Sequence, residues 1–150
     1  MDLNKITADL EFVGSSVHNV EIKADMIKIP DNVKKSFALD IKSSRPLIKD
    51  NQKFGRLLMQ VEVSLFDEID EQKSDLFKIV IEGVFKTSSE MADEAFMELL
   101  NINGGAALFS IVRSKIEVLS GLTYTEGKIV LPMINVIQYF VERKALEETE

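Results

Sequence analysis

The segment from Leu108 to Leu119 constrains the fold more than any other part of the chain. Drawn as an α-helix at about 100° per residue, it carries apolar side chains over about half of its circumference. These side chains are Leu108, Phe109, Ile111, Val112, Ile116, Val118 and Leu119. A helix that lies on its own sheet needs a stripe of only about 100°. The surplus indicates either a second buried contact, with another copy of the chain, or a central position in a monomer core.

Two alternating runs before this helix indicate an antiparallel hairpin. Residues 57–65 and 77–85 each place apolar residues on one face of a strand, and the charged residues 67–74 join the two runs. The wholly apolar faces carry Leu57, Met59, Val61, Val63 and Leu65, then Phe77, Ile79, Ile81, Gly83 and Phe85. The mixed faces still hold Leu58, Phe66, Leu76, Val80 and Val84. That is more than a freely solvated sheet face requires.

The remaining segments complete an α+β arrangement. Residues 8–24 and 37–41 look extended, with a bulge or kink at 14–16 and a polar loop at 43–53. Ser88 or Ser89 would cap a short helix that residues 101–105 end, and the apolar helix would run to about Ser120. A short extended run at 129–131 precedes Pro132, which would open the last helix. We expect a single domain spanning 1–150: a four-stranded antiparallel sheet followed by helices packed on one face.

Composition narrows the classes of function. The chain has no cysteine, which excludes a disulfide framework and fits a reducing compartment. No signal peptide and no apolar run of about 18 residues is evident, so we expect a cytoplasmic protein without membrane insertion. The net charge is -7, and residues 54–105 hold 4 basic and 11 acidic side chains. Such a surface repels phosphate backbones and argues against a nucleic-acid partner.

Catalytic and metal-binding patterns are absent from the sequence. His18 is the only histidine and has no second ligand at a recognisable spacing. Gly104 and Gly105 are better explained as a helix stop and start than as an anion site. The acids at 67, 68, 70 and 71 lack the glycine and the spacing of an EF-hand, so they indicate a solvated hairpin tip. We expect no enzyme activity, no cofactor and no metal.

Several motifs resemble the bacterial export chaperone family SecB. Its helix motif Leu-Phe-Pro-Tyr-Ala-Arg is matched by Leu108-Phe109-Ser110-Ile111-Val112-Arg113, and its Pro-Val/Ile-Asn-Phe motif by Pro132-Met133-Ile134-Asn135-Val136. The family's Gly-Gly-Ile-Phe strand end is similar to Glu82-Gly83-Val84-Phe85, and its Thr-Phe before a kink is similar to Glu11-Phe12. No proline follows Phe109, and Val136 stands where the family has phenylalanine, which marks a divergent relative.

The resemblance implies a SecB-like fold and a SecB-like function. Members form dimers and tetramers with their long helices packed between sheets, and they hold unfolded polypeptides in apolar grooves without ATP. The expected oligomer interface is Leu108, Ile111, Val112, Val118 and Leu119. The expected client-binding residues are Phe12, Phe37, Leu58, Phe66, Leu76, Val80, Met133 and Tyr139.

The resemblance also bears on coupling to the translocation motor SecA. In the family an acidic surface on the sheet meets the basic zinc-binding tail of SecA. Glu21 and Asp25 preserve two of the acidic positions, whereas Lys78 reverses the sign of a third. Because rim charges act mainly on encounter and specificity, we expect weak or absent coupling to SecA.

Three hypotheses follow from these patterns. The first is a holding chaperone that binds unfolded or precursor polypeptides, with a link to protein export. The second is a non-enzymatic adaptor of the same fold dedicated to one partner, such as an antitoxin or a phage protein. The third is an enzyme whose carboxylate site the sequence does not reveal.

Overall fold

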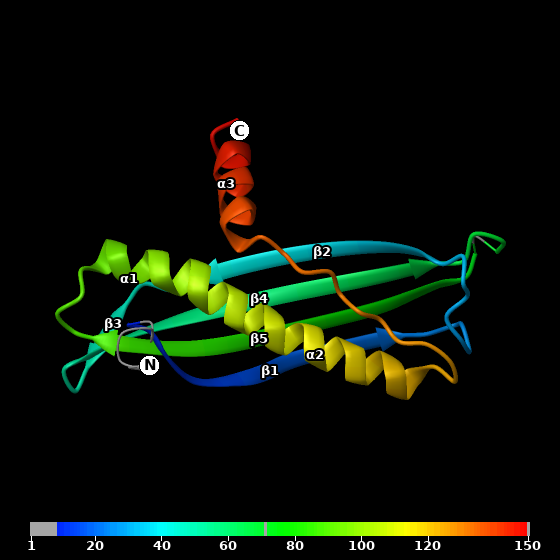
Figure 1. Ribbon diagram of the computed structural model, residues 1–150, viewed down its shortest axis with the longest axis horizontal. Helices are drawn as coiled ribbons and strands as arrows, with labels where there is room; N and C mark the ends of the chain where they lie inside the picture. The colour runs from blue at the N-terminus through cyan, green and yellow to red at the C-terminus, as the bar shows by residue number, and fades with distance from the viewer. Residues whose placement is uncertain (1–8, 71, 150) are drawn as a thin grey trace, which may run out of the picture.

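The computed structural model describes residues 9–70 and 72–149 and consists of one long sheet, a helical layer and a projecting helix (Figure 1). In chain order the elements are β1 (Glu11–Lys23), β2 (Lys34–Ser43), β3 (Leu47–Lys49), β4 (Gln52–Phe66), β5 (Ser74–Ser88), α1 (Asp93–Leu99), the π-helix η2 (Leu100–Gly104), α2 (Gly105–Thr123) and α3 (Val136–Glu147). The α+β class and the antiparallel sheet are therefore confirmed.

The sheet has five strands, and the prediction of four was wrong. Its order is β1-β5-β4-β2, and β3 pairs with the start of β4. The additional strand, β3, lies in the predicted loop 43–53, where Leu47 pairs with Phe54. Asp50 and Asn51 make the tight turn between β3 and β4, with φ of 52° and 58°. Asn and Asp tolerate this left-handed conformation, which suits a two-residue hairpin turn. Three residues of strand are too few for periodicity to reveal.

The predicted antiparallel hairpin is formed by β4 and β5, and these two strands lie at the centre of the sheet. Every second residue of β4 from Lys53 to Leu65 is buried, as is every second residue of β5 from Asp75 to Thr87. The two strands pair antiparallel over their whole length, from Gln52 opposite Ser88 to Phe66 opposite Ser74. The strand β1 pairs with β5, and its register shifts between Phe12 and Gly14, where a kink was expected, and again at His18.

The helices α1, η2 and α2 follow one another without a break. The prediction that residues 101–105 end a helix was wrong, because a π-helical turn continues through them. The site of the first cap was also wrong: α1 begins after Ala92 and has no side-chain cap. Gly104 is needed for close approach, since a Cβ there would lie 3.1 Å from Leu57 Cδ1. Gly104, which was expected to end a helix, therefore allows the helix to pack closely against the sheet.

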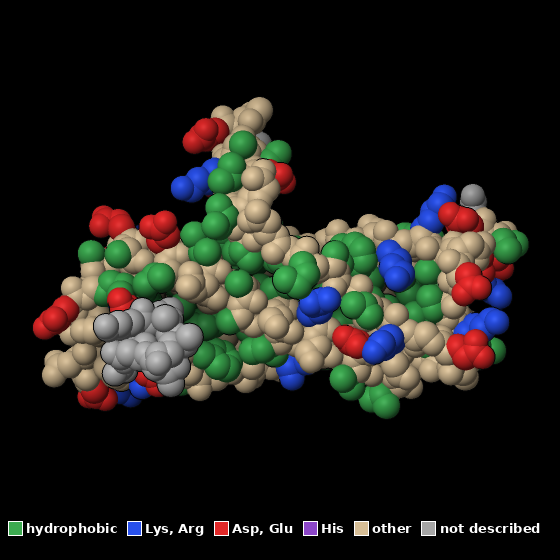
Figure 2. All heavy atoms as spheres, in the orientation of Figure 1, with side chains coloured by type: hydrophobic (Ala, Val, Ile, Leu, Met, Phe, Trp, Pro, Cys, Tyr) green, Lys and Arg blue, Asp and Glu red, His purple; other side chains and the backbone are tan. Residues whose placement is uncertain are grey.

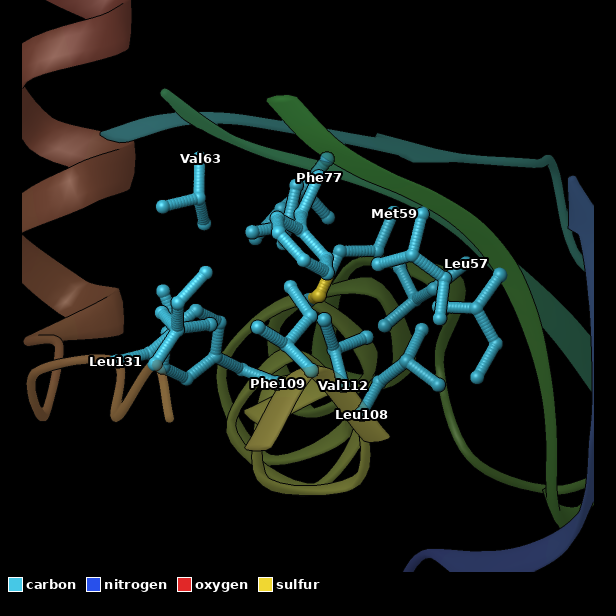
Figure 3. Close-up of a cluster of buried hydrophobic side chains, with 14 of the residues drawn as sticks. Leu57, Met59, Val63, Phe77, Leu108, Phe109, Val112 and Leu131 are labelled. Carbon is cyan, nitrogen blue, oxygen red and sulfur yellow. The ribbon is translucent and has the colours of Figure 1, made fainter. Parts of the chain in front are cut away.

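The helical run Asp93–Thr123 is long and apolar enough, by length and composition, to cross a membrane. This corrects the expectation that no such stretch exists. Its Phe96, Leu100, Leu108 and Val112 are buried in the core, which is the behaviour of a core helix. Figure 3 shows Leu108 and Val112 directed from α2 toward Leu57, Met59 and Phe77 of the sheet.

An extended segment, residues 124–135, leads from α2 to α3 across the helix-covered face of the sheet (Figure 1). Its run 129–131 is extended but belongs to no strand within the described part of the chain. Ile129 and Leu131 are nevertheless buried. The last helix begins at Val136 rather than at Pro132, because Asn135 caps it by accepting a hydrogen bond from the Gln138 amide. We call residues 124–135 the crossover segment.

The helix α3 stands away from the sheet, in contrast to α1 and α2 (Figure 1). Its only fully buried residue is Val136, and its far half is exposed. The helices α1, η2 and α2 therefore contribute buried side chains to the core, whereas most of α3 does not.

Candidate functional site

A groove lined largely by apolar side chains lies between the α1–η2 run and α3. It has a volume of about 610 Å³. The lining residues are Glu94, Met97, Glu98, Asn101, Ile102, Ile137, Phe140, Val141 and Lys144. Ile137 is 58% exposed and Val141 is 55% exposed, although both are aliphatic. Figure 2 shows hydrophobic side chains gathered along the base of α3 on this side of the molecule. We call this concavity the α3 groove.

Hydrogen bonds to the edge of the sheet hold α3 in its projecting position. The Ile41 amide of β2 donates to the Tyr139 hydroxyl oxygen at 3.0 Å, and Arg143 donates to the Ile41 carbonyl. Arg143 also lies 3.6 Å from Asp40 and 3.1 Å from Glu147. These contacts satisfy edge groups of β2 that would otherwise face water or another strand. They fix the helix at its base and leave its apolar stripe uncovered.

A row of polar side chains on α2 fixes the crossover segment. Arg113 Nε donates to the Leu131 carbonyl at 2.7 Å, and the Ile129 amide donates to Ser120 Oγ at 2.7 Å. Lys128 donates to Glu117 at 2.5 Å, and this hydrogen bond and the charge of Lys128 lower the pKa of Glu117. These residues lie at positions 113, 117 and 120, one turn apart on the helix. The row turns Ile129 and Leu131 inward and leaves Met133 exposed.

The start of the crossover segment is fixed by a buried carboxylate. Asp75 Oδ2 accepts from the Tyr124 hydroxyl at 2.5 Å, and Oδ1 accepts from the amides of Asp25 and Met26. Burial first, and then the hydrogen bond to the nearby Asp75 carboxylate, raise the pKa of Tyr124. This pair ties β5, the β1–β2 loop and the segment together. It holds the α2 end of the segment, and the α3 groove lies at the other end.

A second, smaller groove of about 390 Å³ lies between β1 and α2. Val17 and Val20 of β1 form one wall, and Val118 and Leu119 of α2 form the other. Ile79 also lines this groove, together with Ser114 and Lys115. The edge strand β1 remains half open because α2 covers β4 and β5 more than it covers β1. We call this concavity the α2–β1 groove.

The predicted oligomer interface separates into two groups. Leu108 and Val112 are fully buried and pack on the sheet, so the chain's own core occupies them. Ile111 and Leu119 are half-buried, and Val118 is 59% exposed. Only the second group faces outward and is open to a partner.

The predicted client-binding residues lie on separate surfaces. Phe12 stacks on Phe85 at 5.3 Å between ring centroids, on the helix-covered face of the sheet. Phe37 lies on the same face, opposite Val63. The four residues of the opposite face are Leu58, Phe66, Leu76 and Val80. Only Met133 and Tyr139 lie close to α3, and the Tyr139 hydroxyl is already hydrogen-bonded to the backbone of β2. The prediction therefore combined residues that no single groove brings together.

On the sheet face that the helices do not cover, a basic residue lies among the acidic residues expected to face SecA. Lys78 lies between Glu21 of β1 and Glu62 of β4 in the sheet register. Glu21 also lies 3.2 Å from Lys23. Asp25 is exposed in the loop after β1, away from this row. The acidic surface is therefore broken at its middle by a base.

Most of the residues that line the α3 groove were not predicted from the sequence. Ile137 and Val141, one turn apart in the last helix, were the available signal, but an amphipathic pattern does not show whether its apolar stripe is covered. Met97, Ile102 and Phe140 were not predicted as site residues for the same reason. Within residues 9–70 and 72–149, no three metal-ligating side chains cluster.

The layered arrangement of this chain is that of a SecB-like fold. Its structure is similar to the Mycobacterium tuberculosis Rv1957 SecB-like chaperone, solved in complex with a ChAD peptide from the Rv1956 HigA1 antitoxin. The TM-score is 0.62, the identity is 11%, and the match covers 83% of this chain and 90% of that chain. No protein-family model and no curated protein matches the sequence. The likeness concerns the fold.

Proposed function

We propose that the protein is an ATP-independent holding chaperone that binds apolar segments of unfolded polypeptides in the α3 groove. The exposure of Ile137 and Val141 beside Met97 and Ile102 is the observation that carries the proposal. Exposed apolar side chains gathered in a groove with a polar rim are typical of an interaction site. Met133, three residues before α3, and Phe12 and Phe37 on the helix-covered face of the sheet are proposed as accessory contacts outside the α3 groove.

The mechanism requires no bond to be made or broken. A client side chain that leaves water contributes about 1.5–3 kcal/mol. Two or three such side chains exceed the cost of ordering a segment only by a small margin. Individual contacts are then weak and reversible, and several grooves on one oligomer hold a client by avidity. Met97 and Met133 suit this role because flexible thioethers adapt to varied partners.

The proposal includes assembly into a dimer or tetramer in the cytoplasm. Ile111, Val118 and Leu119 would pack against the corresponding surface of a second copy, which would close the α2–β1 groove. It also includes weak or absent coupling to SecA, because Lys78 opposes a basic partner in the middle of the acidic row.

A dedicated adaptor is the second candidate. The similar Rv1957 protein was solved with one antitoxin peptide, which favours a single specific partner as well as a general client range. Such an adaptor would use the same groove but would recognise one sequence. A toxin–antitoxin or phage protein would fit that role.

Light scattering with two unrelated unfolding proteins separates the two candidates. A holding chaperone at micromolar concentration suppresses the aggregation of both, and an adaptor suppresses neither. Failure to suppress either protein would refute the chaperone function and leave the adaptor.

A further inference from the structure

We propose that Met133 is an oxidation-sensitive site, and that Arg113 receives the sulfoxide formed there. The chain has no cysteine, so methionine thioethers are its only oxidisable sulfur groups. Oxidation at Met133 would alter an exposed apolar side chain, three residues before α3, that we propose as an accessory client contact. The consequence for client binding rests on the proposed function, whereas the site of oxidation does not.

Access to sulfur differs sharply among the methionines. Met133 is 83% exposed, whereas Met59 is fully buried and Met26 is nearly so. Met91 and Met97 are partly buried against the core, and Met1 lies outside the described residues. Oxidation of a thioether by peroxide requires the sulfur to be reached from solvent. Met133 is therefore the position in the described chain that peroxide attacks first.

The guanidinium of Arg113 lies beside the Met133 sulfur, where it would bind the oxygen of a methionine sulfoxide. Arg113 Nη1 lies 3.5 Å from Met133 Sδ, and Arg113 Nε is held by the Leu131 carbonyl at 2.7 Å. A thioether is a weak acceptor, and a sulfoxide oxygen is a much stronger one. The fixed guanidinium would donate to that oxygen. Arg113 is thus a positioning residue that holds the oxidised side chain against α2.

The chemistry balances with hydrogen peroxide as the oxidant. The thioether sulfur attacks one peroxide oxygen, an S–O bond forms and the O–O bond breaks. The sulfur is oxidised by two electrons. The proton on the transferred oxygen passes to the second oxygen, which leaves as water. The product is polar and chiral, so an adaptable apolar contact becomes a polar one. Client binding at the Met133 contact should weaken, and a methionine sulfoxide reductase should restore it.

The site is tested by peptide mass mapping during titration of the whole protein with hydrogen peroxide. We expect Met133 to oxidise about tenfold faster than Met59 and faster than Met97. In the same samples, oxidation should shift the Arg113 side-chain nitrogen resonances of the wild type but not those of Met133→Leu. Equal oxidation rates at Met97 and Met133, or unchanged Arg113 resonances, would overturn the proposal whether or not the protein binds clients.

The consequence is tested by the ratio of client affinity before and after peroxide, measured with a reduced, carboxymethylated polypeptide. We expect wild-type affinity to fall about three- to tenfold. The ratio should stay near one in Met133→Leu and should fall as in the wild type in the control Met91→Leu, because Met91 does not line the α3 groove. A fall of the same size in Met133→Leu would contradict the proposed effect on binding.

Discussion

Apolar side chains are buried at the centre of the molecule and partly exposed at its periphery. Over β4 and β5, the residues that face α1, η2 and α2 are buried without gaps, from Leu57 to Leu65 and from Phe77 to Phe85. At α3 and β1, side chains of the same kind are left half exposed or more. One region accounts for stability, because filled contacts are what a core requires. The other is where we propose that polypeptides bind, because it retains apolar area that has not yet left water.

The largest loss of stability should follow from removing a large side chain from the core. Phe96 is fully buried against Gly55, so Phe96→Ala should destabilise the protein by about 3–5 kcal/mol. The matched control is Leu146→Ala on α3, which is exposed and should cost within about 0.5 kcal/mol. Urea unfolding followed by circular dichroism measures both. Similar losses for the two variants would erase the distinction between centre and periphery.

Overfilling the same region should have the next largest effect. A Cβ at Gly55 would lie 2.7 Å from Leu100 Cδ2 and 2.8 Å from the Phe96 ring, closer than packed atoms approach. Gly55→Ala should therefore destabilise by about 1–3 kcal/mol. Gly14→Ala, on edge strand β1, meets nothing within 4 Å and should be close to neutral. Thermal unfolding of the two alanine variants gives the comparison, and a neutral Gly55→Ala would contradict the packing described for α1.

A charge on the outward side of α2 should separate subunits without unfolding them. Val118→Asp would bury an unpaired carboxylate in the proposed interface, which costs about 3–5 kcal/mol of assembly free energy when no partner is present. Sedimentation at micromolar concentration should then show the 16.9 kDa monomer. Ile69→Asp, at the exposed hairpin tip, is the control and should leave assembly intact. A wild type that is itself monomeric would refute the interface.

The smallest effect should be on affinity for the translocation motor SecA. Lys78→Glu would complete an acidic row with Glu21 and Glu62, and it should raise affinity for a basic SecA tail peptide about threefold to tenfold at low salt. Lys73→Glu, in the loop before β5, is the charge-matched control. Calorimetric titration measures the difference. Tight, salt-sensitive binding by the wild type, lost in Glu21→Lys, would instead restore an ordinary export role.

The same contrast explains what could be predicted from the sequence. Alternation over 57–65 and 77–85 gave the right buried faces, because a strand shows its two faces in its own residues. Leu108 and Val112 were placed in an interface because a helix does not reveal which of its apolar sectors the chain itself covers. The π-helical turn at Leu100–Gly104 was missed since glycine pairs usually end helices. Ile137 and Val141 were not predicted as site residues, and only the projecting position of α3 shows that they are uncovered.

The central claim is that the uncovered side chains at α3 bind polypeptide segments. Isothermal titration with a reduced, carboxymethylated polypeptide tests it most directly, using wild type and the double variant Ile137→Asp/Val141→Asp. Leu146→Asp is the matched control, because Leu146 lies on the same helix but does not line the α3 groove. We expect wild type and control to bind with a negative heat-capacity change, and the double variant to bind at least about tenfold more weakly while remaining folded. Equal binding by all three proteins, or no binding by the wild type, would contradict the account.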